Sequence, residues 1–122
     1  MVGDISKTAV RQDLINKTID TFGKVDILIY SAGAGSPEKG IYEVTEKSFD
    51  DQFGVNCRAP FFLVQGLVPH LEATKGNIVL ISSVVAMTPQ PYMQLYSVGK
   101  HIMDHMAKCM AVDLGPKGKV NL

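Results

Sequence analysis

The side chains best suited to chemistry lie in one short stretch, from Ser82 to Lys100. Tyr96 and Lys100 are four residues apart, which places a phenol and an ammonium on one face of a helix. An ammonium beside a phenol stabilises the phenolate and lowers the phenol's pKa from about 10 toward the operating pH. Ser83 lies thirteen residues before Tyr96, after a short apolar run, and could hydrogen-bond a substrate oxygen. The spacing predicts an acid–base site.

Each of these residues also has an ordinary structural explanation. A Tyr-x-x-x-Lys pair can occur by chance. In that case Tyr96 would be a partly buried aromatic residue and Lys100 a solvated charge on the helix surface. Coincidence becomes a poor explanation once Ser83 stands at the required spacing and at a predicted strand end. Its neighbour Ser82 is better explained as a strand-terminal hydroxyl. His101 and His105 suggest a metal site, but no third ligand is evident, so we interpret them as a solvated helix face.

Helices and strands that could position these groups alternate along the chain. Apolar periodicity predicts helices at residues 6–22, 45–72 and 94–114. Gly23 closes the first of these helices, while Thr45 caps the second and Gly76 breaks it. Apolar, β-branched residues predict a strand at residues 25–30, covered on both faces, and a second strand at 77–81. Residues 119–122 are interpreted as the opening of another strand. This alternation predicts an α/β fold with a parallel sheet, and ligands bind such sheets beside the carboxyl ends of the strands. Gly33 and Ser83 would both lie at that edge.

The composition narrows the class of protein. The 122 residues suit one small domain, with 46% apolar residues, 20% charged residues and a formal net charge of zero. A net charge of zero means that the chain has no excess of positive charge to attract nucleic acid. No apolar run is long enough for a membrane span. Cys57 and Cys109 lack a metal-like spacing and are interpreted as free thiols. No leader is evident, so we expect a cytoplasmic protein, or one in another reducing intracellular compartment.

Six segments carry recognisable motifs in a consistent order. They are Gly3–Ile5, Asp26–Gly33, Val55–Phe62, Gly76–Ser83, Tyr96–Lys100 and Ala111–Gly115. Together they resemble the short-chain dehydrogenase/reductase family, whose fold is a Rossmann-type doubly wound parallel sheet. The resemblance runs through essentially the whole chain. It implies that residues 1–122 are the middle portion of one NAD(P)-binding domain, truncated at both ends.

The resemblance implies an NAD(P)-dependent oxidoreductase that transfers hydride between a nicotinamide cofactor and a carbonyl or alcohol substrate. It assigns the acid/base role to Tyr96, assisted by Lys100 and Ser83, with Asn56 as a fourth catalytic member. It assigns cofactor contacts to Asp4, Ile5, Ser31, Ala32, Gly33, Tyr96 and Lys100, and it assigns no metal. The Gly-rich pyrophosphate turn, and the residue that separates NAD from NADP, are not among the segments matched. The expected cofactor is therefore NAD(P)(H), without a choice between the two.

Several assigned positions have a second explanation. Pro60 has no N–H, so the Asn56 carbonyl lacks its helical partner; it could hold a relay water, or the proline merely bends the helix. Asp4 could contact adenine or cap the helix that follows. The family's usual Asn-Asn-Ala-Gly reads Tyr30–Gly33 here, which loses both amides, although Ser31 can still donate and accept. Gly33 is interpreted as a site of close backbone approach rather than a phosphate loop.

The last helix carries a stripe of methionines, Met103, Met106 and Met110. The stripe could pack in the core, or it could lie at a dimer interface, since the family commonly uses this helix to dimerise. The resemblance implies a homodimer or homotetramer at full length. The competing hypothesis is a truncated, catalytically inactive module that dimerises or binds a partner. We expect the 122 residues alone to be inactive, because sheet edges would be exposed.

Overall fold

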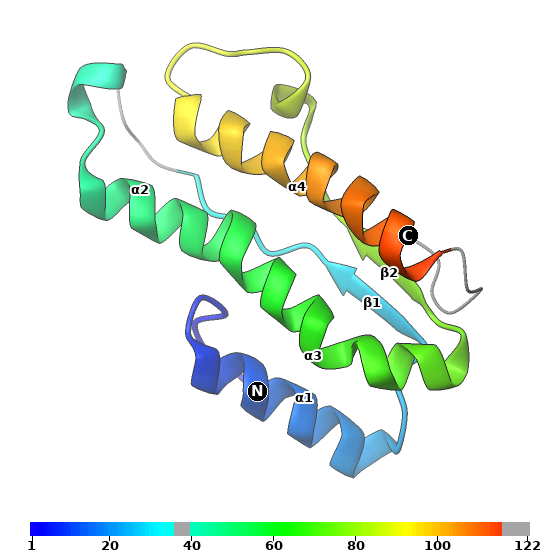
Figure 1. The fold of residues 1–122 in the computed structure, drawn as a ribbon. Coiled ribbons are helices and arrows are strands. Elements are labelled where there is room, and N and C mark those ends of the chain that lie inside the picture. Colours follow the sequence, from blue (N-terminus) through cyan, green and yellow to red (C-terminus); the bar gives the residue numbers. More distant parts are fainter. Residues whose placement is uncertain (36–39, 116–122) are drawn as a thin grey trace.

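The computed structural model describes residues 1–35 and 40–115, arranged as a small sheet beside a layer of helices (Figure 1). The sheet is a parallel pair of strands, β1 (Ile27–Tyr30) and β2 (Asn77–Leu80). The helices are α1 (Thr8–Phe22), α2 (Glu46–Phe53), α3 (Ala59–Thr74) and α4 (Gln94–Leu114). Short 3₁₀ turns are formed by η1 (Ile41–Glu43) and η3 (Val84–Ala86). The predicted parallel α/β arrangement is confirmed, while the strand predicted at 119–122 lies outside the described residues.

The predicted second helix forms, but not as one continuous α-helix. It begins as predicted at Thr45, whose hydroxyl accepts from the Ser48 N–H while the Ser48 hydroxyl accepts from the Thr45 N–H. Between α2 and α3 lies a π-helical segment, η2 (Gly54–Arg58), in which the Ala59 N–H bonds to the Gly54 carbonyl. Pro60 explains the change of pattern, since it has no N–H to offer the carbonyl four residues earlier.

The turn from α3 into β2 depends on two adjacent residues. Lys75 takes the left-handed conformation (φ 53°) that ends α3, and the Gly76 N–H bonds to the Leu71 carbonyl at 2.8 Å. A Cβ at Gly76 would lie 2.5 Å from the Asp26 carbonyl oxygen. Gly76 was predicted to break the helix; its absent side chain is needed because β1 passes so closely.

The two faces of the sheet have different environments. Tyr30 and Ile78 are buried toward the helices, where they join a core with Ala59, Leu63, Val64, Leu67, Leu71 and Met103. Ile27, Ile29, Val79 and Ile81 on the alternate positions are 39–62% exposed. Cover on both faces was predicted, and within the described residues it is found on one face only. Across residues 1–35 and 40–115, no helix is both long and apolar enough to cross a membrane.

The methionine stripe of α4 is part of the interior. Met103 is fully buried, while Met106 and Met110 are partly buried and pack against the core. Of the two explanations offered by the sequence, core packing is therefore correct for Met103. His101 and His105 are exposed, as expected for a solvated face. Within the described part of the chain, no group of three or more His, Cys, Asp or Glu side chains is placed to hold a metal ion.

Candidate active site

Lys100 is the most deeply buried cation of the predicted site. Its side chain comes from the second turn of α4, is 2% exposed, and donates from Nζ to the Ile81 carbonyl at 2.7 Å. The ammonium lies 5.8 Å from the centroid of the Tyr96 ring. Burial lowers the pKa of Lys100 below its ordinary value, and the carboxylate of Asp104 offsets this in part. The structure thus brings the predicted phenol and ammonium together.

Gly33 approaches the same ammonium from the end of β1. A Cβ at this position would lie 3.3 Å from Lys100 Nζ and 3.6 Å from Asn56 Oδ1. The contact with Asn56 would be ordinary packing, but the contact with Lys100 would be tight, so a side chain at Gly33 requires the ammonium to shift by a few tenths of an ångström. Ser31, Ala32 and Gly33 are exposed beyond the carboxyl end of the strand. The prediction of close backbone approach at Gly33 agrees with this geometry.

Asn56 is fully buried and clamps the loop that follows β1. Its Oδ1 accepts from the Ala34 N–H at 3.0 Å, and its Nδ2 donates to the Ala34 carbonyl at 2.7 Å. Its other side faces α4, where a Cβ at Gly99 would lie 3.1 Å from the Asn56 Cβ. The side chain therefore joins three elements around Lys100. The relay role of its backbone carbonyl stays a prediction.

Ser83 lies just beyond β2, at the start of η3. Its hydroxyl accepts from the Val85 N–H at 3.4 Å. Two side chains of α4 hold this turn in place: the Ser97 hydroxyl donates to the Val85 carbonyl at 2.6 Å, and His101 Nδ1 lies 3.1 Å from the Ala86 carbonyl oxygen. Ser83 is thereby kept beside the part of α4 that carries Tyr96 and Lys100. The adjacent Ser82 instead donates to the Lys100 carbonyl at 3.5 Å, a structural role.

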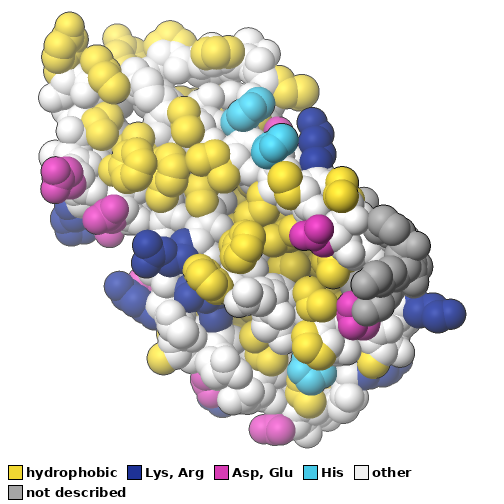
Figure 2. Space-filling model, in the orientation of Figure 1, with side chains coloured by type: hydrophobic (Ala, Val, Ile, Leu, Met, Phe, Trp, Pro, Cys, Tyr) yellow, Lys and Arg dark blue, Asp and Glu magenta, His cyan; other side chains and the backbone are white. Residues whose placement is uncertain are grey.

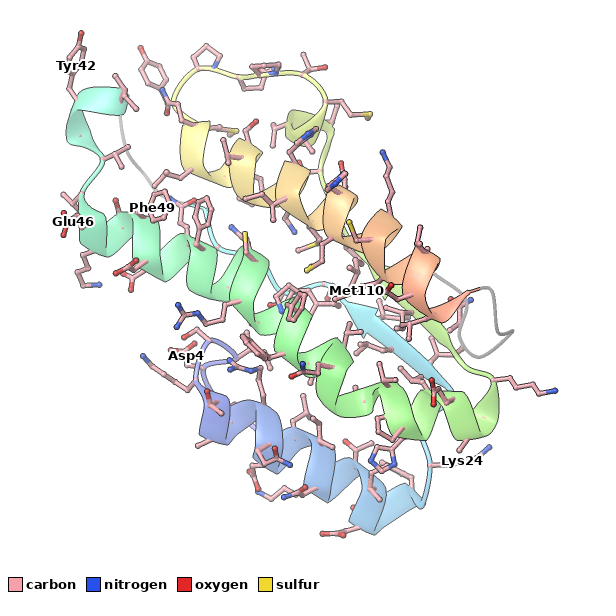
Figure 3. The ribbon with its side chains drawn as sticks, viewed as in Figure 1. Asp4, Lys24, Tyr42, Glu46, Phe49 and Met110 are labelled. Carbon is pink, nitrogen blue, oxygen red and sulfur yellow. The ribbon has the colours of Figure 1, made fainter. Side chains whose placement is uncertain are left out.

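Asp4 stands at the start of the chain, in a turn before α1 (Figure 3). Its Oδ1 accepts from the Ser6 N–H at 2.9 Å. Hydrogen bonding from the Ser6 side chain, and to a smaller extent from this N–H, lowers the pKa of the exposed carboxyl, with Lys7 nearby adding a further effect in the same direction. The N-cap of α1 is Lys7, and no side-chain hydrogen bond caps the helix there. The alternative that Asp4 caps this helix is wrong, since its carboxylate orders the preceding turn. That turn also explains why the helix begins at Thr8 rather than Ser6.

The comparisons with known proteins agree with this arrangement. The family model described as short chain dehydrogenase matches residues 1–122. The chain belongs to the short chain dehydrogenase family. This confirms the resemblance inferred from the six sequence segments, and with it the incomplete Rossmann-type sheet.

The relatives that this chain matches are about twice as long. The chain is 34% identical over 124 residues to 1,2-dihydroxy-1,2-dihydronaphthalene dehydrogenase of Pseudomonas putida, covering 99% of itself and 48% of that protein. It is 30% identical to short-chain dehydrogenase/reductase SDRA of Arabidopsis thaliana, covering 99% and 47%. The crystal structure of 3-ketoacyl-(acyl-carrier-protein) reductase from Brucella melitensis, complexed with NADH, superposes with a TM-score of 0.91 at 30% identity, covering 97% and 50%. The chain spans about half the length of the relatives it matches.

Arg11 and Tyr30 are buried polar residues whose roles were not predicted from the sequence. Arg11 is 4% exposed and donates to the carbonyls of Ile5 and Ser6 at 2.9 and 2.7 Å, which fixes the turn that carries Asp4. Tyr30 is 3% exposed and donates its hydroxyl to the Val55 carbonyl at 2.6 Å. For Arg11 a signal was present, because a charge four residues before Ile15 falls on the buried face of its helix.

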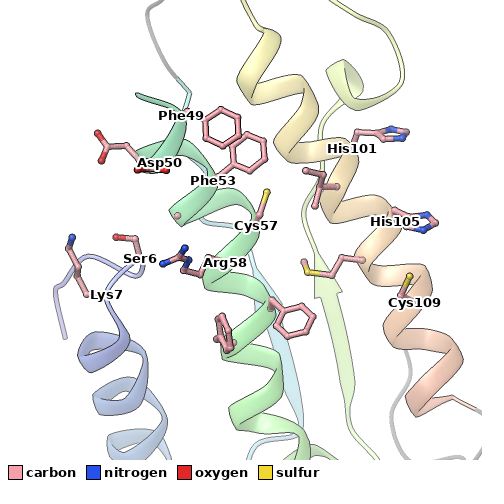
Figure 4. Close-up of a pocket in the computed structure, with 16 residues that line it drawn as sticks. Ser6, Lys7, Phe49, Asp50, Phe53, Cys57, Arg58, His101, His105 and Cys109 are labelled. Atoms are coloured by element: carbon pink, nitrogen blue, oxygen red, sulfur yellow. The ribbon is translucent and has the colours of Figure 1, made fainter. Parts of the chain in front are cut away.

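A separate hollow of about 1090 Å³ lies between α4 and the α2–α3 helices. Its lining includes Phe53, Cys57, Phe61, Ile102, Met106 and Cys109, and contains none of Ser83, Tyr96 or Lys100. Figure 4 shows Phe53 and Cys57 pointing toward α4, and Figure 2 shows hydrophobic side chains gathered over these helices. This hollow is thus distinct from the acid–base cluster.

Proposed function

We propose that this chain supplies the acid–base half of an NAD(P)-dependent oxidoreductase site. The reaction would transfer hydride between a nicotinamide cofactor and a carbonyl or alcohol substrate. The observation that carries the proposal is the buried Lys100 ammonium, held by Ile81 at 2.7 Å and 5.8 Å from the Tyr96 ring. A charge this deeply buried is costly to the fold, and such placements cluster at functional sites.

Tyr96 would move the proton. When a carbonyl is reduced, its oxygen gains negative charge, and the Tyr96 hydroxyl would protonate that oxygen; in the reverse direction the phenolate would accept the alcohol proton. The Lys100 ammonium would stabilise the phenolate by its charge. Ser83, held beside α4 by the bonds to η3, would donate a hydrogen bond to the same substrate oxygen and keep it close to Tyr96.

Asn56 would complete the set through its backbone. Its side chain is engaged by Ala34, which leaves the carbonyl as the group available for a relay water leading to Lys100. The π-helical segment supports this role, because Pro60 cannot donate to that carbonyl.

The exposed edge beyond β1 and β2 fits a nicotinamide cofactor. Lys100 has three N–H donors, and its bond to Ile81 engages one, so others can face ribose hydroxyls. Ser31, Ala32 and Gly33 leave backbone free for close approach, while Asp4 and Ile5 would meet the adenine end. The bound cofactor would supply or remove hydride. We assign the cofactor as NAD(P)(H), with residues 1–122 as part of one NAD(P)-binding Rossmann domain.

We further propose a homodimer or homotetramer at full length, with a second copy seated on the hollow between α3 and α4. Its exposed apolar side chains include Phe61 at 44% and Ile102 at 37%. Such a patch supports burial against another protein surface. The same observation supports the second candidate function, a catalytically inactive module that only dimerises. The free thiols of Cys57 and Cys109 support a reducing compartment such as the cytoplasm.

A measurement of turnover distinguishes the oxidoreductase from the catalytically inactive module. In the full-length protein, Tyr96→Phe should lower the rate of NAD(P)H-dependent carbonyl reduction about 10²- to 10⁴-fold, because it removes the acid. Cofactor affinity, measured by NAD(P)H fluorescence, should stay within about threefold, since the ring is retained. Tyr92→Phe, at an exposed tyrosine in the preceding loop, is the matched control. Equal turnover in Tyr96→Phe and the wild type would refute the acid role.

A further inference from the structure

Tyr30 combines core packing with a hydrogen bond between distant parts of the chain. It is the last residue of β1, and its hydroxyl reaches across to the Val55 carbonyl at 2.6 Å. Burial raises the pKa of this phenol to about 12, slightly opposed by the charge of Arg11, so the hydroxyl keeps its proton and remains a donor. The bond ties the end of a strand to the π-helical segment.

The acceptor of this bond is adjacent to Asn56. A π-helical turn leaves backbone carbonyls without their α-helical partners, so an outside donor determines how the turn is held. Fixing Val55 fixes the direction in which Asn56 leaves the helix. Asn56 in turn holds Ala34 by both its N–H and its carbonyl, at 3.0 and 2.7 Å. The strand end, the π-helical turn and the loop thus form a ring that these hydrogen bonds close through the intervening backbone.

This ring encloses the backbone that faces Lys100. Gly33 lies between Tyr30 and Ala34, and a Cβ added to it would lie 3.3 Å from Lys100 Nζ. We propose that Tyr30 is a positioning residue, which holds Asn56 and the 31–34 loop in register with Lys100. The proposal rests on the proposed function for its effect on turnover, but its structural part can be measured without any activity.

The test uses Tyr30→Phe in the full-length protein, since this change removes only the hydroxyl. A matched control is Thr74→Val, which removes a second hydroxyl that donates to a backbone carbonyl, that of Val25 at 2.7 Å. Val25 lies just before the opposite end of β1, away from Lys100. Both variants should lose stability, and only Tyr30→Phe should affect the site.

The first measurement is amide hydrogen exchange followed by NMR. The reference is the Ile81 amide, which bonds to the Tyr30 carbonyl in the sheet. In Tyr30→Phe the exchange rate of the Ala34 amide should rise, relative to the wild type, by about tenfold more than that of the Ile81 amide. In Thr74→Val the two amides should change together. Equal change at Ala34 and Ile81 in Tyr30→Phe would overturn the proposal, because the hydroxyl would then contribute only to overall stability.

The second measurement is the pH dependence of turnover. Tyr30→Phe should lower kcat about 10- to 100-fold and shift the pH–rate profile, while Thr74→Val leaves both unchanged. Faster exchange at Ala34 with unchanged kcat would overturn the role in positioning the site. If the wild type itself shows no turnover, the proposed function fails, and exchange at Ala34 still decides whether Tyr30 holds the loop.

A third measurement covers the case in which Tyr30→Phe does not fold. In the unmodified protein, donation to Val55 predicts a slowly exchanging hydroxyl proton for Tyr30, whereas Tyr42, which is 99% exposed, should exchange its hydroxyl proton rapidly. Equal exchange of the two hydroxyl protons would overturn the proposal.

Discussion

The ammonium of Lys100 donates to the carbonyl oxygen of Ile81 over 2.7 Å, which joins the second turn of α4 to the residue that follows β2. This bond holds a buried charge beside Tyr96. Because burial lowers the pKa of Lys100, the charged form weakens the folded state relative to an exposed lysine.

Lys100→Met should therefore change how stability depends on pH. The folded pKa lies below the ordinary value of 10.5, so between the two values the unfolded chain binds this proton more tightly. The free energy of unfolding of the wild type should rise with pH across that interval, relative to Lys100→Met. Urea denaturation of the full-length protein at several pH values measures the difference. Lys108→Met, at an exposed position of the same helix, is the control, and the same pH dependence there would contradict the interpretation.

Gly33→Ala should impair the site, whereas Gly35→Ala should be tolerated. A methyl group at Gly33 would lie 3.3 Å from Lys100 Nζ, but at Gly35 the nearest atom is Tyr96 Cδ2 at an ordinary 3.9 Å. We expect the kcat/KM of Gly33→Ala to fall about tenfold, equivalent to about 1.4 kcal/mol, from displacement of the ammonium. Steady-state kinetics of both variants provide the comparison. Similar losses in the two would mean that the loop is sensitive as a whole.

Asn56→Ala should destabilise the fold strongly. It leaves the N–H and the carbonyl of Ala34 without the partners that now lie 3.0 and 2.7 Å away, at a cost of about 1 kcal/mol or more for each of these partly buried groups. Asn16→Ala removes an asparagine from an exposed position and should stay within about 0.5 kcal/mol of the wild type. Chemical denaturation gives both values. A small loss in Asn56→Ala would show that the loop closes without the amide.

Two substitutions at the α3–β2 junction should change the free energy of unfolding in opposite directions. Gly76→Ala places a methyl group 2.5 Å from the backbone oxygen of Asp26 and should destabilise by about 1–3 kcal/mol. Lys75→Gly relieves a left-handed residue and should stabilise by up to about 1 kcal/mol. Thermal unfolding of the pair is sufficient, and a loss in Lys75→Gly would contradict the account.

Phe61→Asp should disrupt the proposed dimer. Phe61 lines the hollow between α3 and α4 and is 44% exposed, so a carboxylate there would be buried by a second copy. Light scattering of the full-length protein should show a lower mass than for the wild type. Phe22→Asp, at a 73% exposed residue of α1 outside the hollow, should keep the wild-type mass. A wild type that is monomeric at micromolar concentration would disprove the assembly.

Local sequence signals were sufficient for most of the elements. α4 has the bounds predicted from its periodicity, and Thr45 and Gly23 act at the helix ends where they were expected. These features depend on residues close together in the chain, whose propensities and caps act locally. The same holds for Tyr96 and Lys100, because one helical turn fixes their separation.

Contacts between distant segments could not be predicted in this way. The bond from Tyr30 to Val55 and the clamp of Asn56 on Ala34 join positions more than twenty residues apart. No periodicity encodes such pairs. Pro60 did indicate a distorted helix. A residue without an N–H is compatible with a π-helical segment and with a simple bend, so the sequence could not decide between them. The loss of both family amides from Tyr30–Gly33 was visible, whereas the use of the tyrosine hydroxyl in a new hydrogen bond was not.

The anchoring of η3 to α4 has an evolutionary consequence. Ser97 and His101 bind the carbonyls of Val85 and Ala86, so the turn that carries Ser83 is fixed before the exposed residues 87–93 begin. Mutations in that exposed segment leave both anchors intact. The segment can therefore diversify in length and composition while the turn that carries Ser83 keeps its place against α4.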